Sequence, residues 1–322
     1  MKLKITLAFL AICLFNPSFG QDREKYLKLI KKAQILYGNK AYEKSAQKYT
    51  DAFIAFGNQG ERRHRYKAAC AWAMSNEIDS SFVRLYKISK NGSYSDYEHI
   101  STDTCLNGLH QDKRWKKILK FVIRNKKVKK KADAKLDKNL IVILDTIFKR
   151  DRTPRMESRQ IEKEYGRISD EMKAHRKTMR NADSINLIEV KRILDKRGWL
   201  GSDIIGRRGN QTLYLVIQHA NLKTQEIYLP MMRKAVKKGN AKASELAFLE
   251  DRIAVRQGNK QVYGSQIGRN KQTGEYFIKP IIAPDHVDKR RSKIGLGKLS
   301  DYVSHWNISW DIEKHKKKDS KN

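Results

Sequence analysis

The sequence predicts a mainly α-helical fold, with a short array of helical hairpins followed by a helical domain that contains one small β-hairpin. Two observations support this fold class. Over most of the 322 residues, apolar side chains recur at steps of three and four, which is the period of an amphipathic helix. Only residues 261–266 and 276–280 are short β-prone stretches separated by a turn segment, and together they predict a single hairpin.

Residues 1–20 are typical of a signal peptide. Lys2 and Lys4 precede an apolar run over residues 5–15, and residues 18–20 place small side chains at a cleavage site. The run is too short to span a bilayer, which takes about twenty apolar residues. A buried first helix is the alternative, but charged and polar residues follow at once. We therefore expect an exported protein, periplasmic or secreted, with no transmembrane segment after cleavage.

Residues 22–125 predict a small array of helical hairpins. The first pair of helices covers residues 23–57 and turns at Gly38, and a second pair follows. Tyr42 and Asp79 each open the second helix of a pair, and they stand 37 residues apart. This spacing, with alternating small and aromatic positions, resembles the tetratricopeptide repeat, whose period is about 34 residues. The resemblance implies an array that binds a peptide or protein partner, and a purely structural spacer is the alternative.

The chain is strongly basic, with 69 Lys and Arg against 35 Asp and Glu and a formal net charge of +34. Residues 126–137 predict a lysine-rich linker or exposed helix end, and residues 312–322 predict a disordered basic tail. The surplus charge implies attraction to an anionic envelope component. Nucleic acid is not an expected partner, because the protein is expected to be exported and no nucleic-acid-binding motif is present. A generally basic, solvated surface is the alternative.

Cysteines, histidines and catalytic motifs add few constraints. The mature chain keeps Cys70 and Cys105; an oxidising compartment permits one bridge between them, but we favour two separately buried thiols. His286, His305 and His315 lack the spacing of metal ligands, so no metal ion or cofactor is expected. The P-loop, Rossmann, GxSxG and HExxH fingerprints are absent from the sequence.

Residues 138–311 predict a separate helical domain. Its first helix is expected to stop at Pro154, and Asp183 is expected to cap a helix that ends at Gly198. The other predicted elements are an exposed helix over 155–181, a glycine-bearing turn over 201–209, helices over 210–220, 223–238 and 242–257, the hairpin, and a helical region over 284–306.

A series of short motifs occurs in order within this domain. They are Asp183-Ser184-Ile185-Asn186, Gly198-Trp199-Leu200-Gly201, Leu215 to Ala220, Ala247 to Arg252 and Tyr263-Gly264-Ser265-Gln266, continued towards Trp306. Together they resemble a bacterial family catalogued as domain of unknown function 6624, which implies no known activity. Two positions depart from the family pattern: Leu200 replaces a proline, and Asn221 replaces an acidic residue.

Several polar side chains in these motifs are candidates for one polar pocket, namely Gln218, His219, Asp251, Arg252, Tyr263 and Gln266. His219 and Asp251 are the candidate catalytic pair, with His219 as general base and Asp251 as the acid that orients it. Arg252 would hold an anionic group, and Trp199 joins Gln218, Tyr263 and Gln266 as a candidate binding residue. Alternatively, Asp251 and Arg252 lock the hairpin through Tyr263 and Gln266, because a buried charge needs partners.

The sequence therefore predicts an exported envelope protein that acts as a protein-interaction or ligand-binding scaffold. The alternative is a hydrolase-like enzyme centred on His219 and Asp251 that acts on an anionic envelope substrate. The two differ in whether His219 is reactive, and no particular reaction is identified by the sequence.

Overall fold

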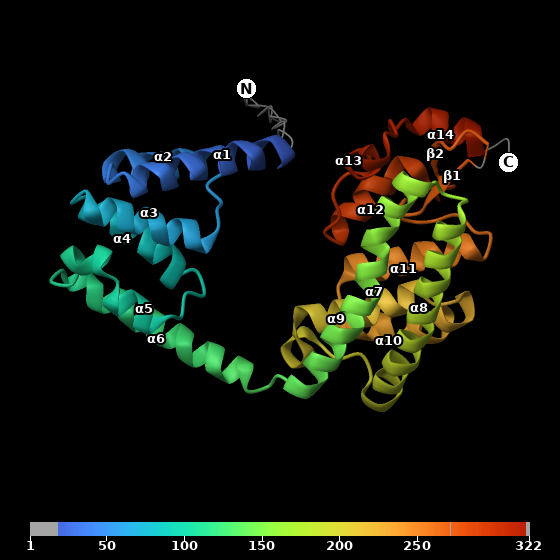
Figure 1. Cartoon of the computed structure of the whole chain (residues 1–322), viewed down its shortest axis with the longest axis horizontal. Coiled ribbons are helices and arrows are strands. Elements are labelled where there is room, and N and C mark those ends of the chain that lie inside the picture. The colour runs from blue at the N-terminus through green and yellow to red at the C-terminus, as the bar shows by residue number, and fades with distance from the viewer. Residues whose placement is uncertain (1–18, 271, 320–322) are drawn as a thin grey trace, which may run out of the picture. The chain divides into compact units, whose positions relative to one another are not determined.

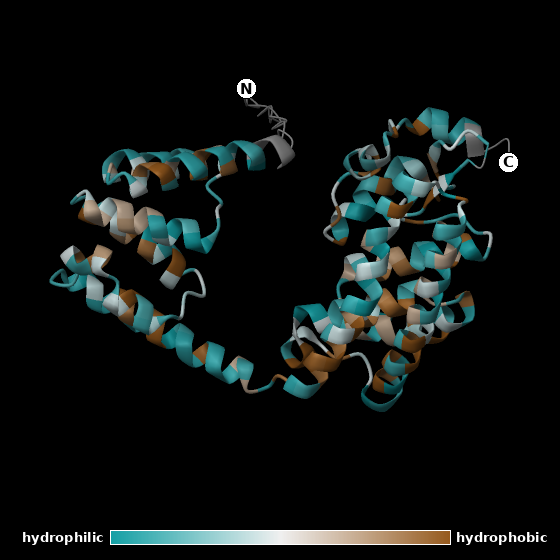
Figure 2. Ribbon diagram, viewed as in Figure 1, coloured by the Kyte–Doolittle hydropathy of each residue, from teal (hydrophilic) through white to brown (hydrophobic). Residues whose placement is uncertain are grey.

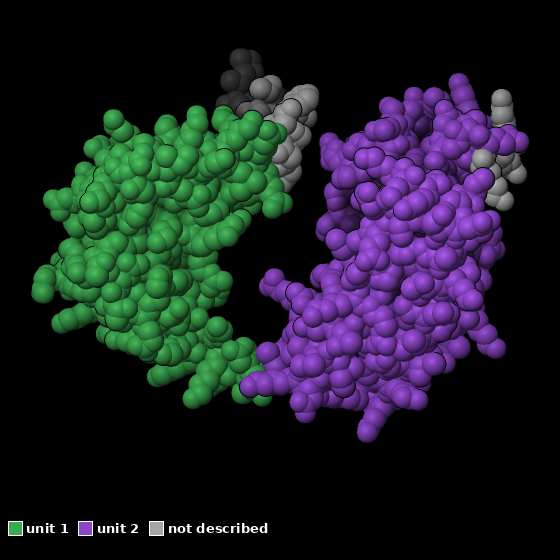
Figure 3. Space-filling view, in the orientation of Figure 1, with its two compact units in different colours: residues 1–134 green, residues 135–322 purple. Residues whose placement is uncertain are grey.

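The computed structural model describes residues 19–270 and 272–319, and the chain divides between residues 134 and 135 into two compact units (Figures 1 and 3). Regular structure in the described residues is almost entirely helical, with one two-stranded antiparallel sheet, which confirms the predicted fold class. None of the described helices combines the length and the apolar character needed to cross a membrane. Residues 1–18 of the predicted signal peptide lie outside the described residues.

Unit 1 is built from helical hairpins. Its elements are α1 (Phe19–Gly38), α2 (Tyr42–Ala55), α3 (Arg62–Met74), α4 (Ile78–Ser89), α5 (Tyr97–Thr102), a 3-10 helix (Thr104–Leu109) and α6 (Lys113–Asp133). Short turns fold α1 against α2 and α3 against α4, and α2 also packs on α3 (Figure 1). This packing agrees with the hairpins expected over residues 22–125. The relationship to the tetratricopeptide repeat stays a prediction.

The two hairpins of unit 1 repeat the same close contact. Ser45 Oγ donates to the carbonyl of Ala33 at 2.7 Å, and Ser81 Oγ donates to the carbonyl of Ala69 at 2.8 Å. All four residues are buried, and equivalent residues stand 36 positions apart in the sequence. Small side chains are required here because the two helices of each hairpin approach closely. The period is 36 and not 37 residues, because α4 begins at Ile78.

Cys70 and Cys105 form a disulfide, with their Cα atoms 5.3 Å apart, so the expectation of two separate thiols is wrong. The side chain of Asp103 accepts a hydrogen bond from the Cys105 amide at 3.2 Å and caps the 3-10 helix. That helix packs on α3, which carries Cys70. The cap and the packing together bring the two cysteines within bonding distance.

Unit 2 is a helical domain with a small sheet. Its elements are α7 (Lys138–Tyr165), α8 (Asp170–Arg197), α9 (Ser202–His219), α10 (Leu222–Lys237), α11 (Ala243–Arg256), β1 (Ile267–Arg269), β2 (Tyr276–Ile278), α12 (Val287–Lys293), α13 (Leu299–Val303) and α14 (Ile312–Asp319). The long helices α7 and α8 pack together and both pack on α9, and α10 packs on α11 (Figure 1). Apolar side chains of α7 to α11 form the main core, and Figure 2 shows that many residues of α7 are hydrophilic.

Helix α7 continues through Pro154, where the sequence predicted a stop. A proline inside a helix removes one backbone hydrogen bond, so other contacts must hold the turns on both sides. Helix α8 supplies them: His175 Nε2 lies 2.7 Å from the Pro154 carbonyl oxygen, and Ser158 Oγ lies 3.4 Å from Met179 Sδ. The helix predicted over 155–181 is therefore two segments, the end of α7 and the start of α8.

The predicted cap at Asp183 is also wrong, and the predicted turn over 201–209 is reduced to a kink. Asp183 lies inside α8, and the side chain that caps this helix is Ser169, whose Oγ accepts from the Met172 amide. Helix α9 passes through the predicted turn with a kink at Gly206, where φ is +68°. Glycine adopts this angle without the steric cost of a Cβ. From this kink onward, α9 to α11 follow the predicted helices.

Only the first strand of the hairpin is shifted along the sequence, because β2 (Tyr276–Ile278) lies within the predicted stretch 276–280. Strands β1 and β2 pair with Ile267 opposite Ile278, so the first strand begins after residues 261–266. Those residues form a loop held by Gln261, whose Nε2 donates to the Gln266 carbonyl at 3.0 Å and whose Oε1 accepts from the Gln266 amide at 2.7 Å. The side chain of Gln261 thus holds a segment that the β-prone sequence predicted as a strand, and its backbone forms an isolated parallel bridge with Ile281.

Of the two basic segments, the one predicted as a linker or an exposed helix end is an exposed helix end over part of its length, and the one predicted to be disordered is partly helical. The predicted linker over 126–137 is the exposed end of α6 as far as Asp133. The predicted disordered tail contains α14, where Asp311 accepts from the amide of Lys314 at 2.9 Å and so caps the first turn. A favourable cap and good helix-forming residues such as lysine offset the charge repulsion in such segments.

Candidate ligand-binding site

The predicted catalytic residues His219 and Asp251 have different partners. His219 ends α9, and its Nδ1 lies 2.8 Å from Oδ1 of Asp151 on α7. Asp251 on α11 is fully buried, and its carboxylate accepts hydrogen bonds at 2.7 to 3.0 Å from three backbone amides, those of Val262, Tyr263 and Ser265. Asp251 therefore anchors the loop before β1, as the architectural interpretation expected. The acid that orients His219 is Asp151, so the role first given to Asp251 is wrong.

Three other residues that were predicted to share a polar pocket do line the same cavity. Gln218, Arg252 and Gln266 line a cavity of about 280 Å³, which Tyr302 and Trp306 also line. Nε of Arg252 is buried and has no hydrogen-bond partner among the described residues. Burial lowers the pKa of the Arg252 guanidinium, and the nearby positive charge of a second arginine lowers it further. This cavity therefore contains a partly desolvated positive charge, as expected for an anion-binding arginine.

Tyr263 and Trp199 belong to the framework. Tyr263 contributes backbone groups: its amide bonds to Asp251, and its carbonyl accepts from Arg291 Nη1 at 2.8 Å. Trp199 lies in the main core of unit 2, and its carbonyl accepts from Asn240 Nδ2 at 3.3 Å. Neither side chain is among those that line the cavity around Gln218.

A charged cluster that the sequence analysis did not single out joins α7, α8 and the end of α9. Asp151 is 1% exposed, and its Oδ1, which faces His219, also forms an ion pair with Arg155 Nη1 at 3.0 Å. Arg155 Nη2 donates to Asp183 Oδ1 at 2.7 Å. The other oxygen of Asp151, Oδ2, is buried without a hydrogen-bond partner among the described residues. The i,i+4 spacing of Asp151 and Arg155 was an available signal, but a helix stop at Pro154 would have separated them.

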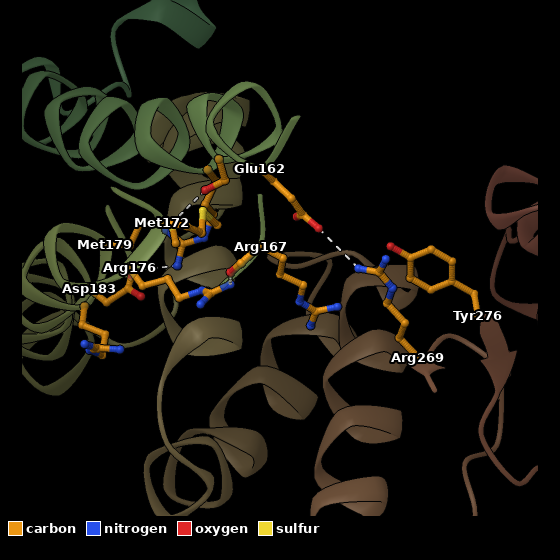
Figure 4. Close-up of a pocket in the computed structure, with 11 residues that line it drawn as sticks. Glu162, Arg167, Met172, Arg176, Met179, Asp183, Arg269 and Tyr276 are labelled. Atoms are coloured by element: carbon orange, nitrogen blue, oxygen red, sulfur yellow. Dashed lines mark hydrogen bonds and ion pairs between the residues drawn. The ribbon is translucent and has the colours of Figure 1, made fainter. Parts of the chain in front are cut away.

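A cavity of about 570 Å³ opens beside this cluster, and α7, α8 and the sheet supply its lining (Figure 4). Five arginines line it, namely Arg155, Arg167, Arg176, Arg180 and Arg269. Its two acidic residues are both paired: Glu162 lies 3.3 Å from Arg269, and Asp183 bonds to Arg155. Figure 4 shows Arg269 reaching Glu162 beside the ring of Tyr276. The lining therefore carries a surplus of positive charge.

Two of these arginines have no partner among the described residues. The side chains of Arg167 and Arg180 are exposed and form no hydrogen bond or ion pair within the part of the chain that the structure describes. Arg176 Nη2 donates to the backbone carbonyl of Arg167 at 2.6 Å, which leaves its charge unpaired as well. Met172 and Met179 add an apolar part to the wall. We refer to this site as the arginine cavity.

The arginine cavity adjoins two smaller cavities through shared lining residues. Arg269 and Tyr276 also line the cavity around Gln218, and Arg180 and Asp183 also line a cavity of about 270 Å³ at His219. The predicted residues Gln218, His219, Arg252 and Gln266 therefore lie at the edges of one larger polar region. Its centre is formed by arginines that the sequence analysis treated only as charges of an exposed helix.

The sequence model of a family of unknown function (DUF6624) matches residues 158–313, which supports the predicted relationship of the C-terminal domain. The match includes Asp183, His219 and four of the five cavity arginines, and it begins after Asp151 and Arg155. No curated protein and no solved structure matches the chain.

Proposed function

We propose that this protein is an exported binding protein whose C-terminal domain holds an anionic ligand in the arginine cavity. The observation that supports this function is the composition of the lining, with five arginines and two acidic residues around about 570 Å³. Guanidinium groups bind phosphate and carboxylate groups through paired N–H donors. A cavity of this volume has the size of a small-molecule site.

The unpaired arginines are the reason to expect a ligand rather than a structural network. Arg155 and Arg269 are neutralised by acidic neighbours, whereas Arg167, Arg176 and Arg180 are not. Like charges gathered around one cavity repel each other, and a bound anion removes this repulsion. The apolar wall of Met172 and Met179 favours a ligand that has an apolar part next to its charged group.

Export is part of this proposal. Residues 1–20 have the pattern of a cleavable signal peptide. The disulfide between Cys70 and Cys105 supports an oxidising compartment, because such bonds are rare in reducing ones. An anionic component of the cell envelope is then the ligand class that both the compartment and the net charge of +34 favour.

Titration calorimetry with pyrophosphate as the probe tests the arginine cavity. We expect the double variant Arg167→Gln/Arg180→Gln to bind at least about tenfold more weakly, a loss of about 1.4 kcal/mol. The matched control is Arg152→Gln/Arg159→Gln, which removes the same charge from exposed positions of α7 outside the lining. Equal weakening in both double variants, or no binding by the parent protein, would show that the cavity is not the site.

For unit 1 we propose an acidic peptide as the partner. A cavity of about 500 Å³ in this unit is lined mainly by basic and aromatic side chains, including Arg62, Arg63, Lys67, Lys129, Tyr66 and Tyr94. Asp96 is the acidic residue of the lining, and it caps α5 by accepting from the His99 amide. Its charge is therefore already engaged, and the cavity favours a negatively charged segment.

Fluorescence anisotropy with a labelled glutamate-rich peptide tests this partner class. Lys67→Glu/Lys129→Glu should weaken binding by about tenfold or more, because it reverses two charges in the lining. Lys44→Glu/Lys117→Glu is the control, with the same change in net charge at exposed positions outside the lining. Indistinguishable affinities of the two variants would rule out this cavity as the peptide site.

A hydrolase is the second candidate function, and one observation favours it. His219 sits at a cavity edge and is oriented by the buried carboxylate of Asp151, the arrangement of a general base. Asp251 is not available for this role, since backbone amides occupy its carboxylate. Under this hypothesis His219→Ala abolishes hydrolysis of an anionic ester such as p-nitrophenyl phosphate while the melting temperature stays close to that of the parent. Absence of hydrolysis by the parent protein, or full activity of the variant, would dismiss the hydrolase.

A further inference from the structure

Asp151, Asp183 and His219 form a group with the composition of a metal site. They come from α7, α8 and α9, and one possible ligand atom of each lies within 4.8 Å of those of the other two. Two carboxylate oxygens and one imidazole nitrogen form a donor set that Zn²⁺ and Mn²⁺ accept. Spacing along the sequence gave no sign of this group, because each ligand is on a different helix.

The second oxygen of Asp151 independently points to a bound cation. Asp151 is 1% exposed, and its Oδ2 has no hydrogen-bond partner among the described residues. A buried carboxylate oxygen is costly unless a donor or a cation neutralises it, so nearly all such atoms have a partner. The same carboxylate faces His219 through Oδ1 at 2.8 Å, so a cation that satisfies Oδ2 lies next to the imidazole.

The guanidinium group of Arg155 supplies the positive charge next to the two acids of this group. Its two terminal nitrogens lie 3.0 Å from Asp151 Oδ1 and 2.7 Å from Asp183 Oδ1. Its side chain is 22% exposed and also lines the arginine cavity, which gives the guanidinium room to move away from the two acids. A metal ion that binds these oxygens must therefore displace Arg155, and the two cations compete.

We propose that Asp151, Asp183 and His219 bind a divalent transition-metal ion, Zn²⁺ or Mn²⁺, in competition with Arg155. The ligand atoms must move closer together to reach bonds of about 2.0–2.2 Å, and departure of the guanidinium from between the two acids permits this. Three protein ligands leave an open coordination position. Two of the three ligands, Asp183 and His219, line the cavity of about 270 Å³, which offers space for a further ligand of the ion. The proposal is independent of anion binding in the arginine cavity.

Calorimetric titration of the chelator-treated full chain with ZnCl₂ or MnCl₂ tests the site directly. Asp151→Asn should weaken binding by about 100-fold or more, because replacing a ligand costs at least as much as replacing the residues that orient it. Asp170→Asn is the matched control, since it removes an exposed aspartate from the first turn of α8. MgCl₂ should bind far more weakly, because Mg²⁺ prefers oxygen ligands to imidazole.

Arg155→Met separates this site from metal binding elsewhere on the protein. Removing the competing guanidinium should raise the affinity for Zn²⁺ or Mn²⁺ by about tenfold, the opposite direction to Asp151→Asn. Circular dichroism of each variant in chelator shows whether it is folded; if Asp151→Asn does not fold, the affinities of Arg155→Met and His219→Gln decide. The proposal is overturned if the affinity for Zn²⁺ or Mn²⁺ is unchanged in Arg155→Met, in Asp151→Asn or in His219→Gln. It is also overturned if the protein binds Mg²⁺ more tightly than Zn²⁺ and Mn²⁺.

Discussion

Asp251 stabilises unit 2 through backbone amides instead of a basic side chain. Its buried carboxylate accepts from three amides of one loop, and a truncated side chain would leave these donors unsatisfied. We expect Asp251→Ala to lower the free energy of unfolding by about 3 kcal/mol or more, and Asp251→Asn by less, because the amide oxygen remains an acceptor. Urea unfolding measures both variants.

Glu250, the neighbour of Asp251, provides the control for this prediction. Glu250 is partly exposed and pairs with Arg233 at 2.8 Å, so Glu250→Ala should change the free energy of unfolding by at most about 1 kcal/mol. Equal effects of the two alanine variants would show that the loop does not depend on Asp251.

The buried carboxyl group of Glu245 should make the free energy of unfolding depend on pH. Burial raises the pKa of its carboxyl above the ordinary value of 4.5, although Lys242 at 3.1 Å acts in the opposite direction. Between the unfolded and folded pKa values the native state binds more protons, so its contribution to stability falls as pH rises through this window. Glu245→Gln removes the titration. We expect the variant to gain stability relative to the parent as pH increases from 4 to 7, measured by urea unfolding at each pH.

A constant difference between Glu245→Gln and the parent across this pH range would contradict the prediction. Glu43→Gln serves as the control, since Glu43 is an exposed residue in the first turn of α2. Its substitution should not produce a difference that grows with pH in this direction.

At the scale of elements, the kink in α9 depends on Gly206. Its φ of +68° and ψ of +166° lie in a region that is essentially limited to glycine and that costs other residues about 1–3 kcal/mol, although no atom would contact the added methyl group. Gly206→Ala should therefore lower the free energy of unfolding by about this amount. Gly297→Ala is the control, because Gly297 has open space and no positive φ, and it should cost much less. A neutral Gly206→Ala in chemical denaturation would mean that α9 straightens.

The packing of α7 on α8 decides how the charged segment after Pro154 is used. Arg155 bonds to Asp183, and Ser158 and His175 also contact across the two helices. These contacts extend α7 past a residue that ends most helices and place Asp151 and Arg155 on one continuous face. Both the arginine cavity and the proposed metal site depend on that continuity.

At the scale of the whole molecule, each unit has apolar cores of its own. The disulfide between Cys70 and Cys105 lies in unit 1 and closes a loop of 35 residues. Loop closure of this length stabilises a domain by about 3–4 kcal/mol. Reduction should therefore lower the melting temperature of unit 1 and leave that of unit 2 unchanged, because residues 135–322 contain no cysteine.

Differential scanning calorimetry with and without a reducing agent measures this effect. The variant Cys70→Ser/Cys105→Ser should resemble the reduced protein and should no longer respond to reductant. A shift of the transition of unit 2 would contradict the restriction of this effect to unit 1, and a shift of neither transition would contradict stabilisation by the disulfide.

The sequence by itself determined the local features of this protein. Apolar spacing located most helices, including the two hairpins of unit 1. It also selected Gln218, Arg252 and Gln266, which line one cavity although they lie in different motifs. The helices follow from which side of an element is apolar, and a single chain segment contains that information. The three polar residues were selected because they belong to the motifs that carry the family resemblance.

Only the tertiary structure decided which side chains meet. Asp151 and His219 are 68 positions apart, and Cys70 and Cys105 are 35 apart. A helical period shows which face is buried, but the neighbouring helix and its offset along the axis depend on the packing of many side chains at once. The same cause explains Pro154, where contacts made by α8 outweigh the local tendency of proline to end a helix.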